Sequence, residues 1–193
     1  MARIGFKLAK YNKIDTTTKK YATLTDSKVP VFEKVIDEKF APEYNSAELY
    51  ANDGLAESDY SFKKGTLSIT VADDDDAFCA QLLGNTETSG EVTSNVDDIA
   101  DEFGYGHIIP KMVGGVKKYK VEFFPRVKFT KITGDNKTRG EGAEFGTTAI
   151  EGTVFPLETA INGLEIGDWE KHKTLSTFDD AEDYLDSLLT PAT

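Results

Sequence analysis

The sequence predicts a mainly β domain of antiparallel strands with two helices, and three observations lead to this fold class. Apolar and polar residues alternate with a period of two over several segments, as they do in strands that bury one face. Apolar residues recur at helical spacing in only two short segments. Turn-forming pairs such as Gly-Gly and Asp-Gly lie between alternating segments, which favours hairpins between neighbouring strands.

The clearest strand covers residues 119–129. Its odd positions from Tyr119 to Phe129 are apolar and most even positions are polar, so we expect a half-buried strand with one solvated face. Pro125 has no N–H to donate, which predicts a bulge or a sheet edge at that point. Residues 66–71 alternate in the same way, with Leu67, Ile69 and Val71 on one side.

Weaker patterns predict the other strands and the turns between them. Further strands are expected at residues 4–8, 21–24, 29–36, 47–50, 105–109, 144–155 and 169–175. Gly114-Gly115 is expected to form a hairpin turn. Loops are expected at residues 10–20, 52–54, 86–95 and 134–142.

Two helices are expected. Asp73 would cap a helix over residues 74–83 that ends at Gly84. Its apolar side would consist of Phe78, Cys79, Leu82 and Leu83. A second helix covers residues 179–189 and has an acidic first turn, as the helix dipole favours. Its candidate packing face consists of Phe178, Ala181, Tyr184, Leu185, Leu188 and Leu189. This apolar stripe must be covered, either by the protein's own sheet or by a neighbouring molecule.

The composition predicts one packed, soluble domain. The chain has 193 residues, of which 39% are apolar. Acidic residues outnumber basic ones by 34 to 22, for a formal charge of −12, so we expect no grip on nucleic acid phosphates. Cys79 is the single cysteine, and the sequence shows neither an apolar run of membrane-spanning length nor a leader segment. We therefore expect a protein that is made in the cytoplasm and contacts no membrane.

No motif predicts an enzyme, a cofactor or a metal site. The acidic run at residues 73–76 lacks the glycine and glutamate positions of a calcium loop and suits a helix start instead. His107, His172 and Cys79 do not have metal-ligand spacing. A Cys–His pair could still meet in the fold, although Cys79 lies on the apolar side of its expected helix. The glycines of residues 139–146 miss the dinucleotide fingerprint by one position.

Several segments carry a family resemblance through their order and spacing. They are AELYANDGLAESD at 47–59, FKKGTLSI at 62–69, LLG at 82–84, FGYGH at 103–107, KYKV at 118–121, FPRVKF at 124–129 and TTAIEGT at 147–153. Together they are similar to the major tail proteins of siphophages, especially those that infect Gram-positive bacteria. The similarity spans about residues 1–189.

The resemblance implies a tail-tube type of β-sandwich or half-barrel. Some family members carry a C-terminal immunoglobulin-like module, and in this chain we expect a single domain over residues 1–193 without it. The resemblance also implies hexameric rings of this chain that stack into a hollow tube in the virion tail. The implied partners are other copies of the chain, the tape measure protein, the tail terminator and the distal tail protein. DNA would pass through the lumen without specific binding, because inward-facing carboxylates repel phosphates within a Debye length of about 8 Å. The family contributes no catalytic residues.

The region 46–60 is the candidate inter-ring loop, since the family's long early hairpin reaches the adjacent ring. Its candidate residues are Ser46, Glu48, Asn52, Asp53, Gly54, Glu57, Asp59 and Tyr60. An ordinary hairpin within the subunit is the alternative interpretation of this region.

Two other functions remain open. A ring-forming tail accessory or head–tail joining protein would stop at one ring. A carbohydrate-binding β-sandwich would be a monomer with exposed aromatic residues, and the single Trp169 argues weakly against it.

Overall fold

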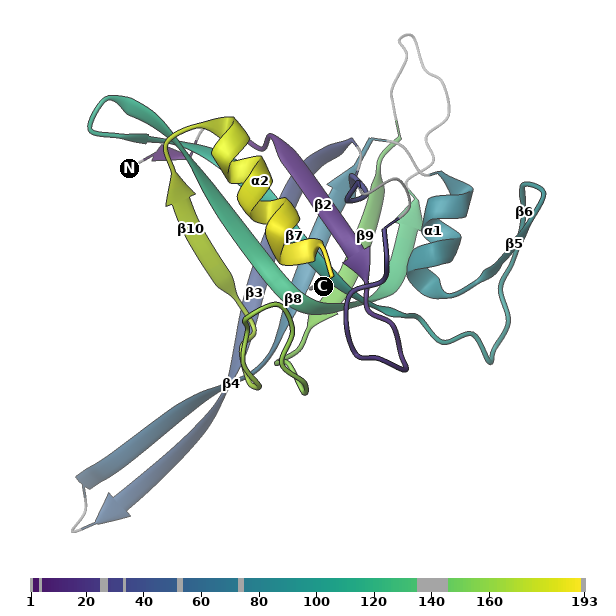
Figure 1. The fold of residues 1–193 in the computed structure, drawn as a ribbon. Coiled ribbons are helices and arrows are strands. Elements are labelled where there is room, and N and C mark those ends of the chain that lie inside the picture. Colours follow the sequence, from purple (N-terminus) through teal and green to yellow (C-terminus); the bar gives the residue numbers. More distant parts are fainter. Residues whose placement is uncertain are drawn as a thin grey trace, which may run out of the picture.

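The structure is a computed structural model that describes residues 2–3, 5–24, 28–32, 34–51, 54–72, 75–134 and 146–191. A strongly curled antiparallel sheet forms its body, and two helices pack on that sheet (Figure 1). The elements are β1 (Ala2–Arg3), β2 (Leu8–Lys13), β3 (Val35–Ala51), β4 (Gly54–Val71), α1 (Asp76–Leu83), β5 (Thr86–Thr88), β6 (Glu91–Thr93), β7 (Glu102–Val113), β8 (Val116–Gly134), β9 (Thr148–Val154), β10 (Lys171–Leu175) and α2 (Phe178–Leu189). The expected mainly β, sandwich-like fold class is confirmed.

The main sheet has the strand order β1-β7-β8-β9-β4-β3, with β2 also pairing β7 and β10 also pairing β8. Every pair is antiparallel. The curl brings the chain before β3 back to β2, where Tyr11 N donates to Pro30 O (3.1 Å) and Phe32 N donates to Ala9 O (2.9 Å). The sheet therefore forms most of a barrel. Neither described helix is long and apolar enough to cross a membrane.

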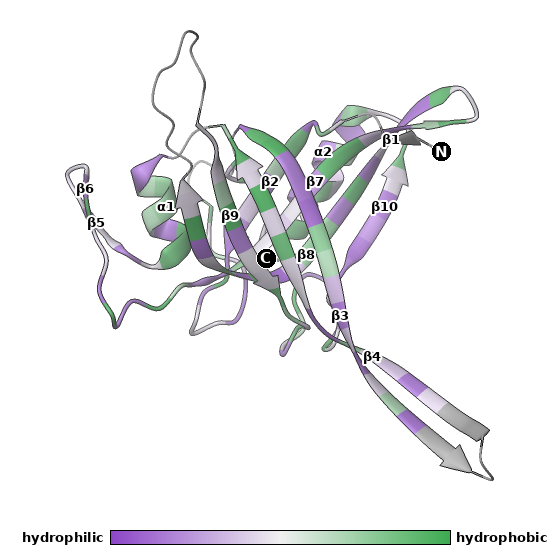
Figure 2. Cartoon of the chain, turned by 180° about the vertical axis from the view of Figure 1, so that it is seen from behind, coloured by the Kyte–Doolittle hydropathy of each residue, from purple (hydrophilic) through white to green (hydrophobic). Residues whose placement is uncertain are grey.

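Two apolar clusters form the core, one on each face of the central strands. The first fills the space that the sheet encloses, and it includes Leu67, Ile69 and Val71, as their alternation predicts. The second lies between α2 and the strands β7 and β8, and it includes Val121, Phe123 and Leu185. Figure 2 shows the apolar residues distributed along the strands of the body.

The strand β8 contains the expected bulge at Pro125 but lacks the expected solvated face. Pro125 and Arg126 lie opposite the single residue Gly104 of β7, so one extra residue inverts the alternation. Phe123, before the bulge, packs under α2, whereas Val127, after it, lies in the enclosed cluster. The prediction that the odd positions share one face was therefore wrong. The middle of the strand is buried on both sides because α2 covers the outer face.

The helix α1 begins later than expected. Its N-cap is Asp75, whose carboxylate accepts a hydrogen bond from Phe78 N (3.0 Å), and not Asp73. Gly84 ends the helix in the left-handed conformation, with φ 74°, as predicted. Ala80 and Leu82 are its buried residues, while Phe78, Cys79 and Leu83 are only half-buried.

The helix α2 confirms its predicted face. Thr177 caps it, and Ala181, Leu185, Leu188 and Leu189 are buried. Phe178 and Tyr184 pack against the edge of the same cluster. Because α2 packs on β2, β7, β8 and β10, the protein's own sheet covers the stripe.

The loop expected at residues 10–20 begins later, because β2 extends to Lys13; residues 15–20 form the loop as predicted. Lys10 Nζ lies 2.8 Å from Glu182 and 2.7 Å from Asp186, both on α2. The Asn12 side-chain amide donates to the carbonyl of Leu189 (2.9 Å). These partners allow two polar residues to be buried in a strand.

Other boundaries also differ from the expectations. Of residues 4–8 only Leu8 is in a described strand, and of residues 21–24 only Tyr21 forms a bridge. Residues 29–36 form a bridge at Val31 before β3 begins at residue 35. Residues 169–170 and 155 lie outside strands, and residues 86–95 contain the β5–β6 hairpin instead of a plain loop. The Gly114-Gly115 turn is confirmed, with φ 58° and 80°. Residues 4, 144–145 and most of the loop expected at 134–142 lie outside the described residues.

Candidate assembly interface

The strands β3 and β4 form a hairpin whose outer part leaves the body (Figure 1). The two strands pair from Val35–Val71 to Ala51–Gly54. The other side of β4 pairs with β9 only over residues 65–71. Between residue 65 of β4 and the tip of the hairpin, β4 pairs only with β3 in the described part of the chain. This outer part of the hairpin is therefore a two-stranded ribbon. We call residues 44–51 and 54–62 the ribbon.

The ribbon carries most of the candidate inter-ring residues. Ser46, Glu48, Asp59 and Tyr60 have exposed side chains, and the backbones of Gly54 and Glu57 lie in β4. Asn52 and Asp53 lie outside the described residues. Ser46 pairs with Tyr60 and Ala47 pairs with Asp59, so Tyr60 and Asp59 project from opposite faces.

The ribbon has little to stabilise it within the chain. Tyr44 and Tyr60 are 52% and 61% exposed, and none of residues 44–48 and 58–62 is buried. A two-stranded hairpin without a packed face is at best marginally stable in water. The side of β3 away from β4 and the outer side of β10 have no strand partner among the described residues. Such edges favour pairing with another chain.

The opposite border of the sheet is covered. Residues 30–32 hydrogen-bond to β2, and the Ala22 N–H donates to the carbonyl of Lys13 (2.8 Å). Among the described residues, the border at β2 is thus covered, whereas the border at β3 is open. This asymmetry suits a head-to-tail contact in which an edge of one copy meets a different surface of the next.

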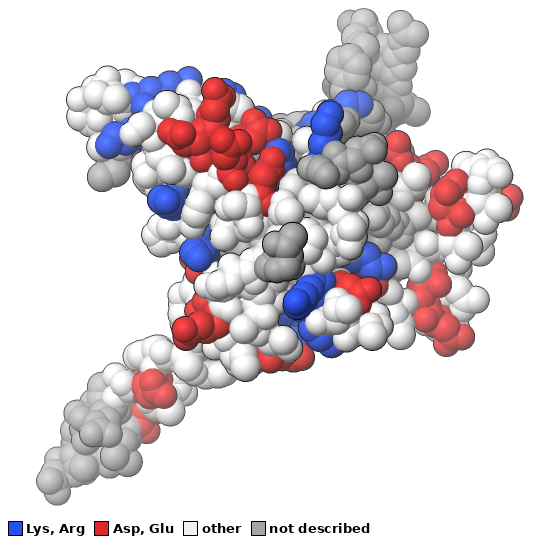
Figure 3. Space-filling model, in the orientation of Figure 1, with Lys and Arg blue, Asp and Glu red and all other residues white. Residues whose placement is uncertain are grey.

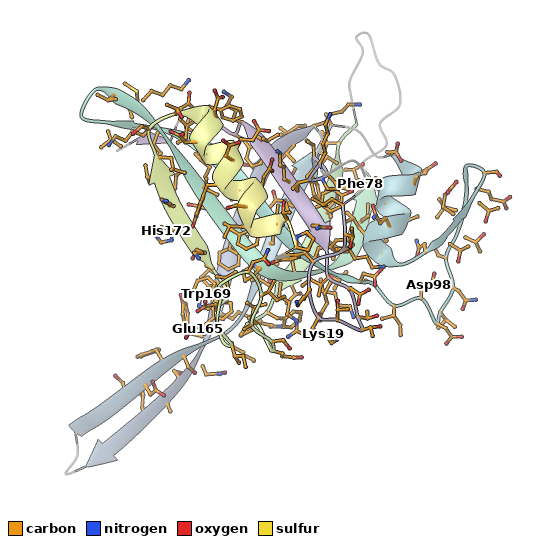
Figure 4. All side chains as sticks on the ribbon, in the orientation of Figure 1. Lys19, Phe78, Asp98, Glu165, Trp169 and His172 are labelled. Carbon is orange, nitrogen blue, oxygen red and sulfur yellow. The ribbon has the colours of Figure 1, made fainter. Side chains whose placement is uncertain are left out.

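Stacked aromatic rings anchor the ribbon to the body. Trp169 stacks on Phe62 of β4 (ring centroids 4.0 Å apart, interplanar angle 9°) and on Phe40 of β3 (5.8 Å, 24°). Phe40 in turn contacts Phe124 of β8 (4.6 Å). Figure 4 places Trp169 at the root of the hairpin. Since its indole is stacked between two protein rings, it is a poor platform for a sugar.

Phe40 packs directly over Gly65, where a Cβ would lie only 2.2 Å from the ring. The root of the ribbon is therefore closely packed, in contrast to its exposed outer part.

The ribbon and the β7–β8 turn carry opposite charges. Residues 44–60 include Glu48, Asp53, Glu57 and Asp59 and no basic residue. Residues 110–121, around the β7–β8 turn, include four lysines and no acidic residue. In Figure 1 this turn lies at the upper left of the body, and the ribbon leaves the body at the lower left. Figure 3 shows acidic atoms on the ribbon and basic atoms near the β7–β8 turn.

A hollow of about 430 Å³ lies beside the root of the ribbon, and it contains a cluster that the sequence did not reveal. His107 Nδ1 lies 3.1 Å from Glu38 Oε2, and His107 Nε2 lies 3.2 Å from Glu122 Oε2. Lys120 forms an ion pair with Glu122, and the Tyr105 hydroxyl donates to Glu38 (2.7 Å). The residues come from β3, β7 and β8, so no local motif could have linked them.

Burial and hydrogen bonding shift two pKa values in this cluster. Burial raises the pKa of Glu122, but hydrogen bonds from His107 and Lys120 outweigh it and hold the pKa well below its usual range. Burial, together with the Glu38 carboxylate, raises the pKa of Tyr105 well above its usual value. Among the described residues, no group of three acidic, histidine or cysteine side chains has the geometry of a metal site. Cys79 lies on α1 and His172 is exposed on β10.

Comparison with protein-family models and with curated proteins found no match.

Proposed function

We propose that this chain is a structural subunit that assembles with copies of itself into a hollow tube, the tail tube of a long-tailed phage. The observation that carries the proposal is the ribbon, which extends from the body. Residues 44–48 and 58–61 have exposed side chains, and the outer edges of the ribbon have no strand partner among the described residues. Such a segment gains stability when another molecule covers it. The order of the segments that resemble siphophage major tail proteins supports the same function.

The acidic ribbon of one copy contacts the lysine-rich β7–β8 turn of the copy in the next ring. Opposite charges on two separate projections of the molecule favour this contact between different surfaces of two copies. A contact between two different surfaces rotates each copy relative to the one before it. Repeated contacts form a closed ring when these rotations add up to a full turn, and a filament when each contact also shifts the copy along the axis. The open edges of β3 and β10 provide contacts within a ring, and the net charge of −12 keeps DNA from adhering to the lumen.

Removal of the ribbon tests the proposal. A variant in which a short Asn-Gly turn replaces residues 46–60 should remain folded, because no described side chain of that segment belongs to the core. We expect it to form no tubes in electron micrographs under conditions in which the wild-type protein forms them.

A matched control shortens the β5–β6 hairpin, which is also exposed but has no role in the proposed contact. This control should assemble as the wild type does. Tubes from the ribbonless variant at wild-type yield would contradict the proposal. Single rings from the wild type, without tubes, would favour a ring-forming tail protein.

A further inference from the structure

The root of the ribbon meets the main sheet through a buried polar cluster. Glu38 lies on β3, near the start of the hairpin, whereas His107 lies on β7 and Glu122 on β8. His107 is only 2% exposed, and each of its ring nitrogens faces a carboxylate oxygen, at 3.1 and 3.2 Å. The imidazole therefore links the hairpin to two strands of the body.

The two protonation states of the imidazole fit this position differently. A neutral imidazole carries one N–H and can donate to only one carboxylate, so its other nitrogen directs a lone pair at the second. Nδ1 of His107 has no hydrogen-bond partner among the described residues, although Glu38 Oε2 is close to it. An imidazolium has two N–H groups and can donate to both Glu38 and Glu122.

We propose that protonated His107 is a latch that holds the root of the ribbon against β7 and β8, and that loss of its second proton loosens this root. The role of the latch in assembly rests on the function proposed above. The latch itself concerns a single chain and is measured without assembly.

The groups around His107 make it the site of the pH response. From β3 it is faced by Glu38, with Asp37 at the rim of the hollow, and from β8 by Glu122 and Lys120. Tyr105 on β7, Glu170 before β10 and the Phe6 ring, which stacks on the imidazole (5.4 Å, 23°), complete the surroundings. Of these residue types only histidine ordinarily changes its charge between about pH 5 and 8.

The protein contains a natural reporter for the latch. Trp169 is the single tryptophan, and it stacks on Phe40 and Phe62 at the root of the ribbon. Any loosening of β3 changes the surroundings of its indole. Phe40 lies two residues from Glu38 on the same strand, so the reporter is close to the latch.

The experiment is a titration of Trp169 fluorescence in the unassembled protein between about pH 5.5 and 8.5. We expect one transition in the wild type, and its loss in His107→Gln. In Glu38→Gln the transition should lose amplitude, because the carboxylate that connects β3 to the imidazole is gone. His172→Gln is the matched control: it removes the other, exposed histidine, three residues from Trp169, and should keep the wild-type transition.

A second measurement identifies the titrating group directly. The chain has only two histidines, so ¹⁵N-imidazole spectra give two sets of signals that His172→Gln assigns. We expect the His107 signals and the fluorescence to follow one midpoint. Any of three results would contradict the proposed latch. The first is a flat fluorescence curve in the wild type, and the second is an unchanged transition in both His107→Gln and Glu38→Gln. The third is a different midpoint in the two measurements.

Assembly assays separate the latch from the proposed function. If both hold, the wild type forms more tubes at about pH 6 than at about pH 8.5, and His107→Gln forms equal amounts at both. A fluorescence transition in a protein that never assembles would support the latch and contradict the tube. Tube formation by a protein without any fluorescence transition would support the tube and contradict the latch.

Discussion

Individual polar residues in strands determine much of this structure. Lys10, Asn12, His107 and Glu122 are buried, and each has a partner on a different element. Burial of such groups is tolerated when they are hydrogen-bonded or ion-paired, and is costly when they are not. Each of these side chains therefore specifies which elements pack together. A substitution that removes one partner leaves the other buried without compensation.

Glu122 makes the stability of the protein depend on pH. Burial raises the pKa of its carboxyl, but hydrogen bonds from His107 and Lys120 outweigh this and lower it from the ordinary value of 4.5. A carboxyl whose pKa is lower in the folded chain stabilises the folded state once the unfolded chain is ionised. The stabilisation by Glu122 is thus complete above its unfolded pKa and is lost as the pH falls towards its folded pKa.

We predict that Glu122→Gln lowers the free energy of unfolding near neutral pH and reduces its fall in acid. Urea unfolding of the wild type and the variant at about pH 7 and about pH 3.5 measures both effects. Glu91→Gln, at an exposed position on β6, is the control and should leave both values unchanged. Equal losses of stability in acid for the wild type and Glu122→Gln would contradict the prediction.

At the scale of the elements, two hairpins of opposite charge differ in how the chain supports them. The β7–β8 hairpin continues into the most buried strands of the sheet, whereas the ribbon is exposed beyond its aromatic root. The basic charge of the turn and the acidic charge of the ribbon suit the contact proposed above. Complementary charges chiefly affect the rate and specificity of association.

A charge exchange tests this contact. We predict that Lys117→Glu with Lys118→Glu reduces tube formation, and that Glu48→Lys with Asp59→Lys does the same. Combining all four substitutions should restore assembly, because attraction replaces repulsion. Light scattering during assembly and electron microscopy measure the outcome.

Lys131→Glu, at an exposed position near the other end of β8, is the control and should assemble as the wild type does. Failure of the fourfold variant to assemble better than either pair alone would exclude a direct contact between the two hairpins.

At the scale of the whole molecule, the C-terminal helix and the ribbon have opposite roles. The helix α2 completes one of the two apolar clusters, whereas the described ribbon residues belong to neither buried set. The four buried residues of α2 are Ala181, Leu185, Leu188 and Leu189. Full burial of one large aliphatic side chain stabilises a protein by about 1.5–3 kcal/mol. Loss of the helix would thus remove a stabilising contribution comparable in size to the whole net stability of a typical domain, about 5–15 kcal/mol.

We predict that a chain ending at residue 177 does not unfold cooperatively. Loss of α2 would expose Val121, Phe123 and Leu157. It would also leave Lys10 without its ion-pair partners Glu182 and Asp186. The ribbonless variant should instead melt within a few degrees of the wild type. Thermal melts followed by circular dichroism compare the two, and a cooperative, wild-type melt of the truncated chain would show that α2 is dispensable.

The sequence by itself determined the features that depend on local periodicity and turn chemistry. Six features follow from residues close together in the chain. They are the fold class, the apolar side of β4, the bulge at Pro125, the Gly84 cap, the Gly114-Gly115 turn and the face of α2. Turn conformation and side-chain alternation are set by neighbours, so they can be inferred from sequence alone.

Only the tertiary structure decided the features that depend on residues far apart in the chain. Residues 10–13 resemble a loop because the partners of Lys10 and Asn12 lie 176 and 177 residues later, on α2. The cluster at His107 joins three strands, and the exposed ribbon becomes evident only once β9 is seen to pair with the inner part of β4 alone. Burial of a charge depends on which distant groups compensate it, and no local pattern contains that information.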